Sequence, residues 1–119
     1  MNKEFVPYQQ ALELKELGFD EPCLAYYNVN NELTFTSIVS QNTNSFWLAN
    51  PNNITSAPLY QQAFRWFREK YGIHITPKKF DTTTWIAEWG YWESPVCYSY
   101  EEAELACLNK LIVSFAGFR

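Results

Sequence analysis

The sequence is poor in the residues that phosphate loops and metal sites require. It has four glycines among 119 residues, one histidine and three cysteines. Glycine-rich phosphate loops need several glycines close together, and zinc sites usually need three or four histidine or cysteine ligands. No C-x-x-C spacing occurs, and no known nucleophile signature surrounds any cysteine. We therefore expect no metal, no cofactor and no enzymatic activity.

Long hydrophobic runs and excess positive charge are also missing. No stretch approaches the ~18 apolar residues of a membrane-spanning helix. The first ten residues, MNKEFVPYQQ, have no apolar run behind the lysine and do not look like a secretory signal. We therefore expect a cytoplasmic protein with reduced, mostly buried cysteines. A formal net charge of −4 gives no overall attraction to nucleic acid.

Apolar and aromatic side chains are plentiful. Hydrophobic residues make up 47% of the chain and aromatic residues 18%. This composition can supply a core and argues against wholesale disorder. A chain of 119 residues fits one domain, so we predict that residues 1–119 form a single domain.

Three helices are predicted where a short motif recurs. Y-Q-Q-A occurs at 8–11 and 60–63, and Y-E-E-A at 100–103. In the first two helices polar residues fall at equivalent offsets on one stripe, and each helix ends at a glycine, Gly18 or Gly72. The stripes consist of Gln9, Glu13 and Glu16 in the first helix and of Gln61, Arg65 and Arg68 in the second.

The helix starts carry capping signals. Ser56 and Pro58 suit the cap and first turn of the second helix, while Ser99 and Glu102 predict a capping box for the third. The apolar stripe of the third helix is rotated relative to the first two, and we expect Leu105 to lie on its buried side.

Strands fill the intervals between helices. β-formers predict strands at 22–29 and 32–39, with Asn30–Asn31 as a tight turn between them, and at 82–89. A last strand is expected within 91–98, with Pro95 at an edge or bulge. Residues 40–57 are predicted to form an Asn-rich loop. The fold class is therefore α+β, with three helices and an antiparallel sheet of about four strands in the order α-β-β-α-β-β-α.

The matched helices raise the question of an internal duplication. One interpretation is a weak repeat of an α-β-β unit at 5–52 and 56–98, followed by a closing helix at 99–115. The alternative is that the same residue types suit the first turn of any helix. The offsets between motifs are too irregular for a solenoid.

Two groups of residues are candidates for binding. Arg65 and Arg68 point outward on the second helix, in a stretch 65–79 that has five basic residues against one acidic residue. Aromatic residues form the other group. In one extended strand Trp85, Trp89 and Tyr91 would share a face, with Trp92 on the other. The aromatic group consists of Trp47, Trp85, Trp89, Tyr91 and Trp92.

Three long blocks carry a resemblance. PYQQALELKELGFDEPCLAYY, APLYQQAFRWFREKYG and YSYEEAELACLNKLI resemble, in this order, a family of small uncharacterised proteins encoded by phages and prophages of gut bacteria. Residues 40–53 and 75–95 do not match. The resemblance implies a phage setting, with the cytoplasm of the host cell as location, and supplies no activity or catalytic residue.

These observations lead to a functional expectation. We expect a small non-catalytic accessory protein of phage type that acts by protein–protein interaction. Self-association through a sheet face carrying Trp85 and Trp89 is also expected, because exposed apolar faces often mark interfaces. The alternative is a nucleic-acid-binding protein that uses the basic stretch 65–79.

Overall fold

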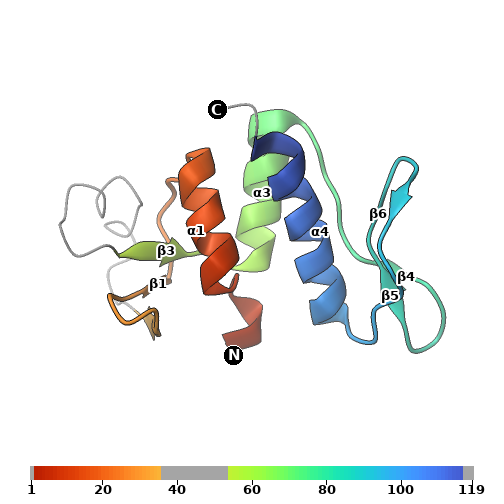
Figure 1. Ribbon diagram of the computed structural model, residues 1–119, viewed down its shortest axis with the longest axis horizontal. Coiled ribbons are helices and arrows are strands. Elements are labelled where there is room, and N and C mark those ends of the chain that lie inside the picture. The colour runs from red at the N-terminus through yellow and green to blue at the C-terminus, as the bar shows by residue number, and fades with distance from the viewer. Residues whose placement is uncertain (1, 36–53, 117–119) are drawn as a thin grey trace. The chain divides into compact units, whose positions relative to one another are not determined.

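Among the described residues, the protein has an α+β fold of three α-helices and three small antiparallel sheets (Figure 1). The structure is a computed structural model that describes residues 2–35 and 54–116. The chain divides into two compact units, residues 1–59 and residues 60–119. Each unit is described by itself below.

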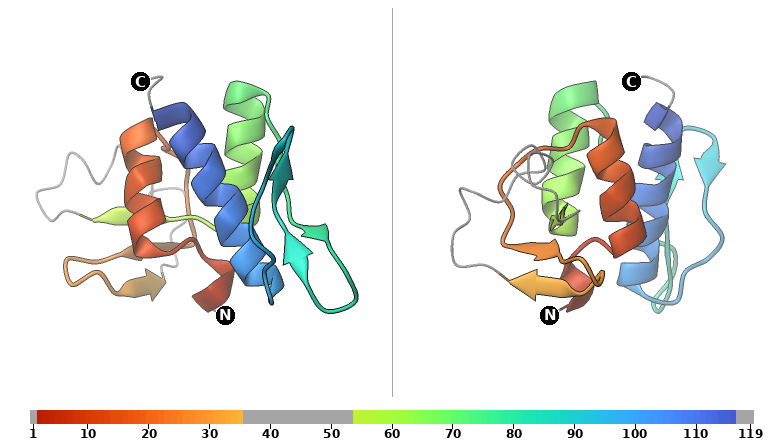
Figure 2. Two further views of the ribbon diagram at one scale, coloured as in Figure 1. Left: turned by 45° about the vertical axis from the view of Figure 1, so that its right-hand side comes forward. Right: turned by 60° about the vertical axis from the view of Figure 1, so that its left-hand side comes forward.

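The first unit packs one helix on a three-stranded sheet. The sheet has the order β2-β1-β3, and both strand pairs are antiparallel. Helix α1 lies against β3, and the connection from β1 to β2 leads through a short turn (Figure 2). The elements are the 3₁₀ helix η1 (Asn2–Glu4), α1 (Tyr8–Leu17), β1 (Ala25–Tyr27), β2 (Leu33–Phe35) and β3 (Thr55–Ala57).

Residues with positive φ end α1 and turn the chain between strands, as the sequence predicts. Gly18 ends α1 with φ of 103°, and its N–H donates to Leu14 and Lys15 carbonyls. Asn31 has φ of 63°, and the Oδ1 of Asn28 accepts from the N–H of Asn30 and of Glu32. Asparagine tolerates the left-handed conformation better than most residues, so the turn costs little strain.

A buried hydrogen bond joins β1 to the segment before α1. The Tyr27 hydroxyl donates to the Val6 carbonyl at 2.6 Å, and the N–H of Val6 donates to the Pro58 carbonyl. The Tyr27 ring also meets the Tyr8 ring edge-on at 5.5 Å. Burial raises the pKa of Tyr27, so its hydroxyl remains a donor at neutral pH.

The second unit pairs two helices and carries two short hairpins. Helices α3 and α4 lie side by side, and the rings of Tyr71 and Phe115 stack between them at 4.1 Å. Strand β5 contacts α4 (Figure 2). The elements are α3 (Tyr60–Tyr71), β4 (Lys78–Lys79), β5 (Trp85–Ile86), β6 (Glu88–Trp89), β7 (Trp92–Glu93) and α4 (Tyr100–Phe115).

The recurring motif marks the first residue of every α-helix in the described ranges. Each helix begins at the tyrosine of its motif, and the alanine three residues later is at most 1% exposed. A side chain without branches or polar atoms suits a position where a helix meets its neighbours closely. The alanines are Ala11, Ala63 and Ala103.

Helix ends follow the predictions in part. The Ser99 hydroxyl accepts from the N–H of Glu102 at 3.1 Å, which confirms the cap of α4. Gly72 has φ of 73° and follows α3, as predicted. The predicted cap of the second helix is wrong, because Ser56 lies within β3 and α3 begins at Tyr60.

The strand predictions need two corrections. The strands form separate sheets of three, two and two strands instead of one sheet of about four. Strand β3 lies in the predicted loop 40–57, where its buried residues are short and largely polar and so give no hydrophobic alternation. The remainder of that loop, 40–53, lies outside the described residues.

The burial predicted for the cysteines agrees with the structure, whereas the burial predicted for Leu105 on α4 does not. All three cysteines are buried and form no disulfide among the described residues, and burial raises the pKa of Cys107 to about 12. On α4, Leu105 is only half-buried, whereas Glu104 is 8% exposed.

In the part of the chain that the structure describes, no helix has the length and apolar character to cross a membrane. The proposed repeat at 5–52 and 56–98 stays a prediction.

Candidate functional site

Four of the five predicted aromatic residues lie on one arm that runs out from Trp85 and back to Cys97; they are Trp85, Trp89, Tyr91 and Trp92. Backbone hydrogen bonds join Trp85 and Cys97 in both directions, at 2.9 and 2.8 Å. Further out, the N–H of Ser94 donates to the Ala87 carbonyl, and the Ser94 hydroxyl accepts from the N–H of Ala87. Strands β6 and β7 complete the arm (Figure 1). We call residues 85–97 the aromatic arm.

The returning side of the aromatic arm contains a bulge. Ala87 pairs with Ser94, but Trp85 pairs with Cys97, so Pro95 and Val96 together stand opposite Ile86. The extra residue is expected where proline cannot donate a ladder hydrogen bond. The Ser94 hydroxyl donates to the Pro95 carbonyl at 2.9 Å and so ties the bulge to the ladder. This confirms the predicted role of Pro95.

The tip of the aromatic arm is a two-residue turn that presents Tyr91. Trp89 and Trp92 are cross-strand partners, which leaves Gly90 and Tyr91 as the connection. Gly90 has φ of 62°, which suits the first central position of a type II′ hairpin turn. Tyr91 is fully exposed to solvent. The most exposed large apolar side chain of the described ranges therefore stands at the end of a hydrogen-bonded hairpin.

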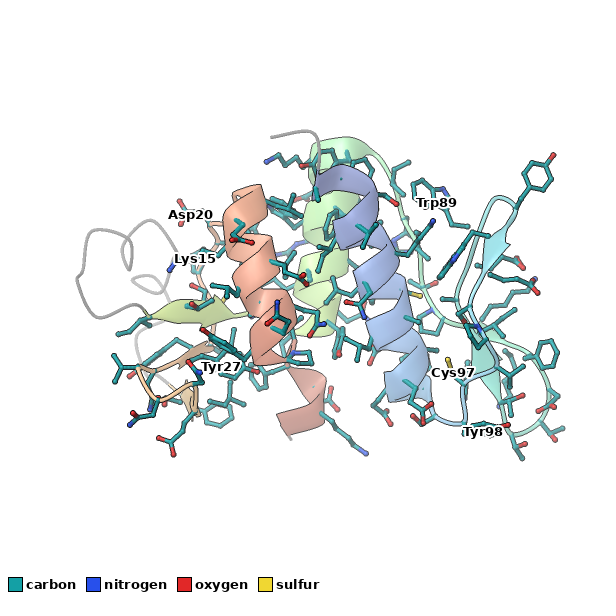
Figure 3. All side chains as sticks on the ribbon, in the orientation of Figure 1. Lys15, Asp20, Tyr27, Trp89, Cys97 and Tyr98 are labelled. Atoms are coloured by element: carbon teal, nitrogen blue, oxygen red, sulfur yellow. The ribbon has the colours of Figure 1, made fainter. Side chains whose placement is uncertain are left out.

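The inner face of the aromatic arm is anchored on α4. The Trp89 ring stacks near Phe115, with ring centroids 6.3 Å apart and planes 30° apart. The Lys110 amine lies over the Trp92 ring at 5.1 Å. Figure 3 shows Trp89 between the arm and α4. Both indoles are half-buried, so they hold the arm in place and leave Tyr91 to face solvent.

The base of the aromatic arm is fixed in the same way. The Trp85 ring meets Tyr100 edge-on at 5.0 Å, and the Lys79 amine lies over Trp85 at 4.4 Å. Burial, with a smaller contribution from the nearby Glu104, raises the pKa of Tyr100, so this tyrosine stays neutral. Aromatic and cation–π contacts therefore support the arm at both ends.

The outer face of the aromatic arm is acidic. Glu88 and Glu93 are directly opposite each other in the register of β6 and β7. Like charges in this position destabilise a sheet by a few tenths of a kcal/mol. The Lys78 amine pairs with the Glu88 carboxylate at 3.3 Å, which offsets the repulsion. Glu93 is exposed, so a negative charge lies beside the tip.

The turn that joins β4 to β5 is stabilised by a single carboxylate. Asp81 Oδ1 accepts from the hydroxyls and the backbone N–H groups of Thr83 and Thr84. The Thr84 hydroxyl, at 2.7 Å, is the largest cause of the lowered pKa of Asp81. Lys78 and Lys79 on β4 are thereby held next to the base of the arm.

The predicted faces of the aromatic residues were partly wrong. Trp85 and Trp89 both contact α4, in agreement with the prediction that they share a face. Tyr91 is not on that face, because the chain reverses at Gly90. Trp92 shares the face of Trp89 instead of the opposite one, because it lies on the returning strand. The structure thus removes the reason for expecting a bare sheet face at Trp85 and Trp89, and self-association stays a prediction.

Other candidates lie elsewhere or were missed. Arg65 and Arg68 are exposed on α3, as predicted, and belong to a different element from the arm. Trp47 lies outside the described residues. Sequence reasoning missed the exposure of Phe80 and Tyr98, which are 55% and 77% exposed. Phe80 stands between Lys79 and Asp81, and Tyr98 stands between Cys97 and Ser99, so neither belongs to an alternating pattern that would assign it to a face.

Comparisons of the chain with protein-family models, curated proteins and solved structures found no significant match. In the described ranges, no cluster of three or more histidine, cysteine or acidic side chains has the arrangement of a metal site. The aromatic arm presents one exposed phenol and two carboxylates on a hydrogen-bonded hairpin.

Proposed function

We propose that the protein is a non-catalytic binding protein that recognises a protein partner through the tip of the aromatic arm. The observation that carries the proposal is the complete exposure of Tyr91 on a hairpin fixed at its tip, inner face and base. Large exposed aromatic side chains are enriched at the energetically dominant positions of protein interfaces.

The physical gain comes from burying one aromatic ring without ordering a flexible loop. An aromatic side chain buries about 150–250 Å² in an interface. At about 25 cal/mol per Å², this corresponds to about 4–6 kcal/mol before the costs of association. Because the hairpin is already formed, little further backbone entropy is lost on binding. A convex tip of this kind fits a pocket on the partner.

The charge of the aromatic arm indicates the rim of that pocket. Glu93 is exposed next to the tip, and Glu88 lies opposite it on the outer face. The formal net charge of the chain is −4. We therefore expect the partner's pocket to be rimmed by lysine or arginine side chains, which would also speed encounter at low salt.

The proposed setting is the cytoplasm of a host cell, with the protein acting as an accessory of a phage or prophage. The support is the resemblance of three sequence blocks and the three buried cysteines that form no disulfide, which suit a reducing compartment. This setting places the partner among proteins of the host or the phage.

The test is capture through Tyr91 itself. A photo-crosslinking phenylalanine analogue at position 91 should form a covalent adduct with the partner in host lysate, and the same analogue at position 98 should not. Tyr98→Ala is the matched control for Tyr91→Ala, because both tyrosines are largely exposed. A partner that Tyr91→Ala loses and Tyr98→Ala retains supports the proposal. Equal capture by both variants would contradict it.

A further inference from the structure

A second surface, on the outward side of α3, has a different chemistry from the aromatic arm. Arg65 and Arg68 are exposed, and Gln61 precedes them on the same stripe. Lys70 is exposed as well, and its amine lies over the Trp66 ring at 4.9 Å, which keeps its charge near the helix. The helix thus carries three cations against Glu69.

One of these cations contacts a histidine ring. An Arg68 Nη1 lies 3.2 Å from His74 Nδ1. A guanidinium only donates, so Nδ1 is the acceptor in this contact. The contact holds Arg68 beside the exposed His74 ring and so joins His74 to the cationic stripe.

The spacing of the donors is linear. Gln61, Arg65 and Arg68 are four and three residues apart, or about 6 and 4.5 Å along the helix axis. Their total span of about 10 Å equals roughly three phosphates at about 3.4 Å per nucleotide of one strand. A line of donors fits a repeating polyanion better than one isolated phosphate.

The surroundings of the stripe argue against other partners. None of the large apolar side chains exposed in the described ranges belongs to α3. A lipid surface or a hydrophobic protein interface would need such side chains beside the cations. We propose that the outward stripe of α3, with His74, binds the phosphate backbone of nucleic acid without sequence preference. This inference is independent of the aromatic arm.

The experiment is a titration of the full chain with fluorescently labelled 20-base-pair DNA of random sequence, followed by anisotropy. Two to three phosphate contacts predict that affinity falls about 10- to 40-fold between about 50 and 200 mM salt. Arg65→Gln with Arg68→Gln should weaken binding at low salt at least about 10-fold, because two such contacts are lost. Lys3→Gln removes a positive charge outside α3 and should change affinity less than about 2-fold.

Further variants keep the result interpretable. Arg65→Lys with Arg68→Lys retains the charges and should keep most of the affinity, even if the glutamine pair destabilises the last turn of α3. Anionic phospholipid vesicles are the competing probe. No salt-sensitive DNA binding by the unmodified chain, an equal loss of affinity in Lys3→Gln, or equally tight binding to vesicles would each overturn the proposal.

Discussion

Tyr27→Phe tests how the first unit is held together. The substitution keeps the ring, and with it the edge-on contact to Tyr8 at 5.5 Å. It removes only the hydroxyl that donates to the Val6 carbonyl at 2.6 Å. Val6 is 0% exposed and Tyr27 is 8% exposed, so water cannot readily replace the lost donor. A buried carbonyl left without its donor lowers the free energy of unfolding by about 1–3 kcal/mol.

The assay is urea unfolding followed by circular dichroism, with Tyr98→Phe as the control. Tyr98 is 77% exposed, so removing its hydroxyl should change the free energy of unfolding by less than about 0.5 kcal/mol. A Tyr27→Phe protein as stable as the unmodified chain would refute the assignment of this hydrogen bond as a stabilising contact.

The pH dependence of the same pair of proteins gives a second check. Burial raises the pKa of Tyr27 above its ordinary value of 10.0. The folded state therefore favours the protonated phenol. The resulting contribution of Tyr27 to the free energy of unfolding is fully present below pH about 10 and is lost as the pH rises through the folded-state pKa. The stability difference between the unmodified chain and Tyr27→Phe should narrow above pH about 10. A difference that widens there would contradict the raised pKa.

Three further predictions concern the core, a helix cap and the thiols. Leu14→Ala should lower the free energy of unfolding by about 2–5 kcal/mol, because Leu14 is fully buried. Glu16 is exposed, so Glu16→Ala should lower it by less than about 0.5 kcal/mol in the same urea assay. Similar losses in the two variants would disprove the assignment of the polar stripe on α1. Ser99→Ala should lower stability by about 0.5–2 kcal/mol through loss of the cap on α4, and Ser99→Asp should restore most of it; no loss on Ser99→Ala would show that the cap is dispensable. A thiol reagent should react slowly with the native protein, whereas in denaturant it should react with all three thiols. Fast reaction of all three thiols in the native state would contradict their burial.

Local helix chemistry could be read from the sequence. The tyrosines begin the three α-helices, Gly18 and Gly72 end two of them, and Ser99 caps the third. Each of these features depends on the residue itself and its near neighbours, so no tertiary information is needed. The outward position of Arg65 follows from the same helical periodicity.

The tip of the aromatic arm could not be read in this way. Residues 82–92 are rich in β-formers, and Gly90 is the single turn signal within the run. A strand interpretation that continues through Gly90 assigns Tyr91 and Trp92 to the wrong faces, because a reversal changes which residues share a side. Only the pairing of Trp89 with Trp92 places Tyr91 in the turn.

Tertiary contacts also overrode local patterns elsewhere. Glu104 follows the capped start of α4 and carries a charge, yet it is only 8% exposed. Strand β3 is short and pairs with β1 through buried small residues that carry no alternating pattern. Burial and strand pairing at such positions depend on tertiary contacts, which composition and periodicity do not reveal.

The affinity of the captured partner for Tyr91→Ala tests the central claim most directly. With purified partner, calorimetric titration should show that Tyr91→Ala weakens binding by about 2 kcal/mol or more, which is at least about 30-fold in Kd. Tyr98→Ala should stay within about 2-fold of the unmodified chain, and both variants should keep its circular dichroism spectrum. A Tyr91→Ala protein that binds the partner as tightly as the unmodified chain would contradict the assignment of the tip of the aromatic arm as the binding site.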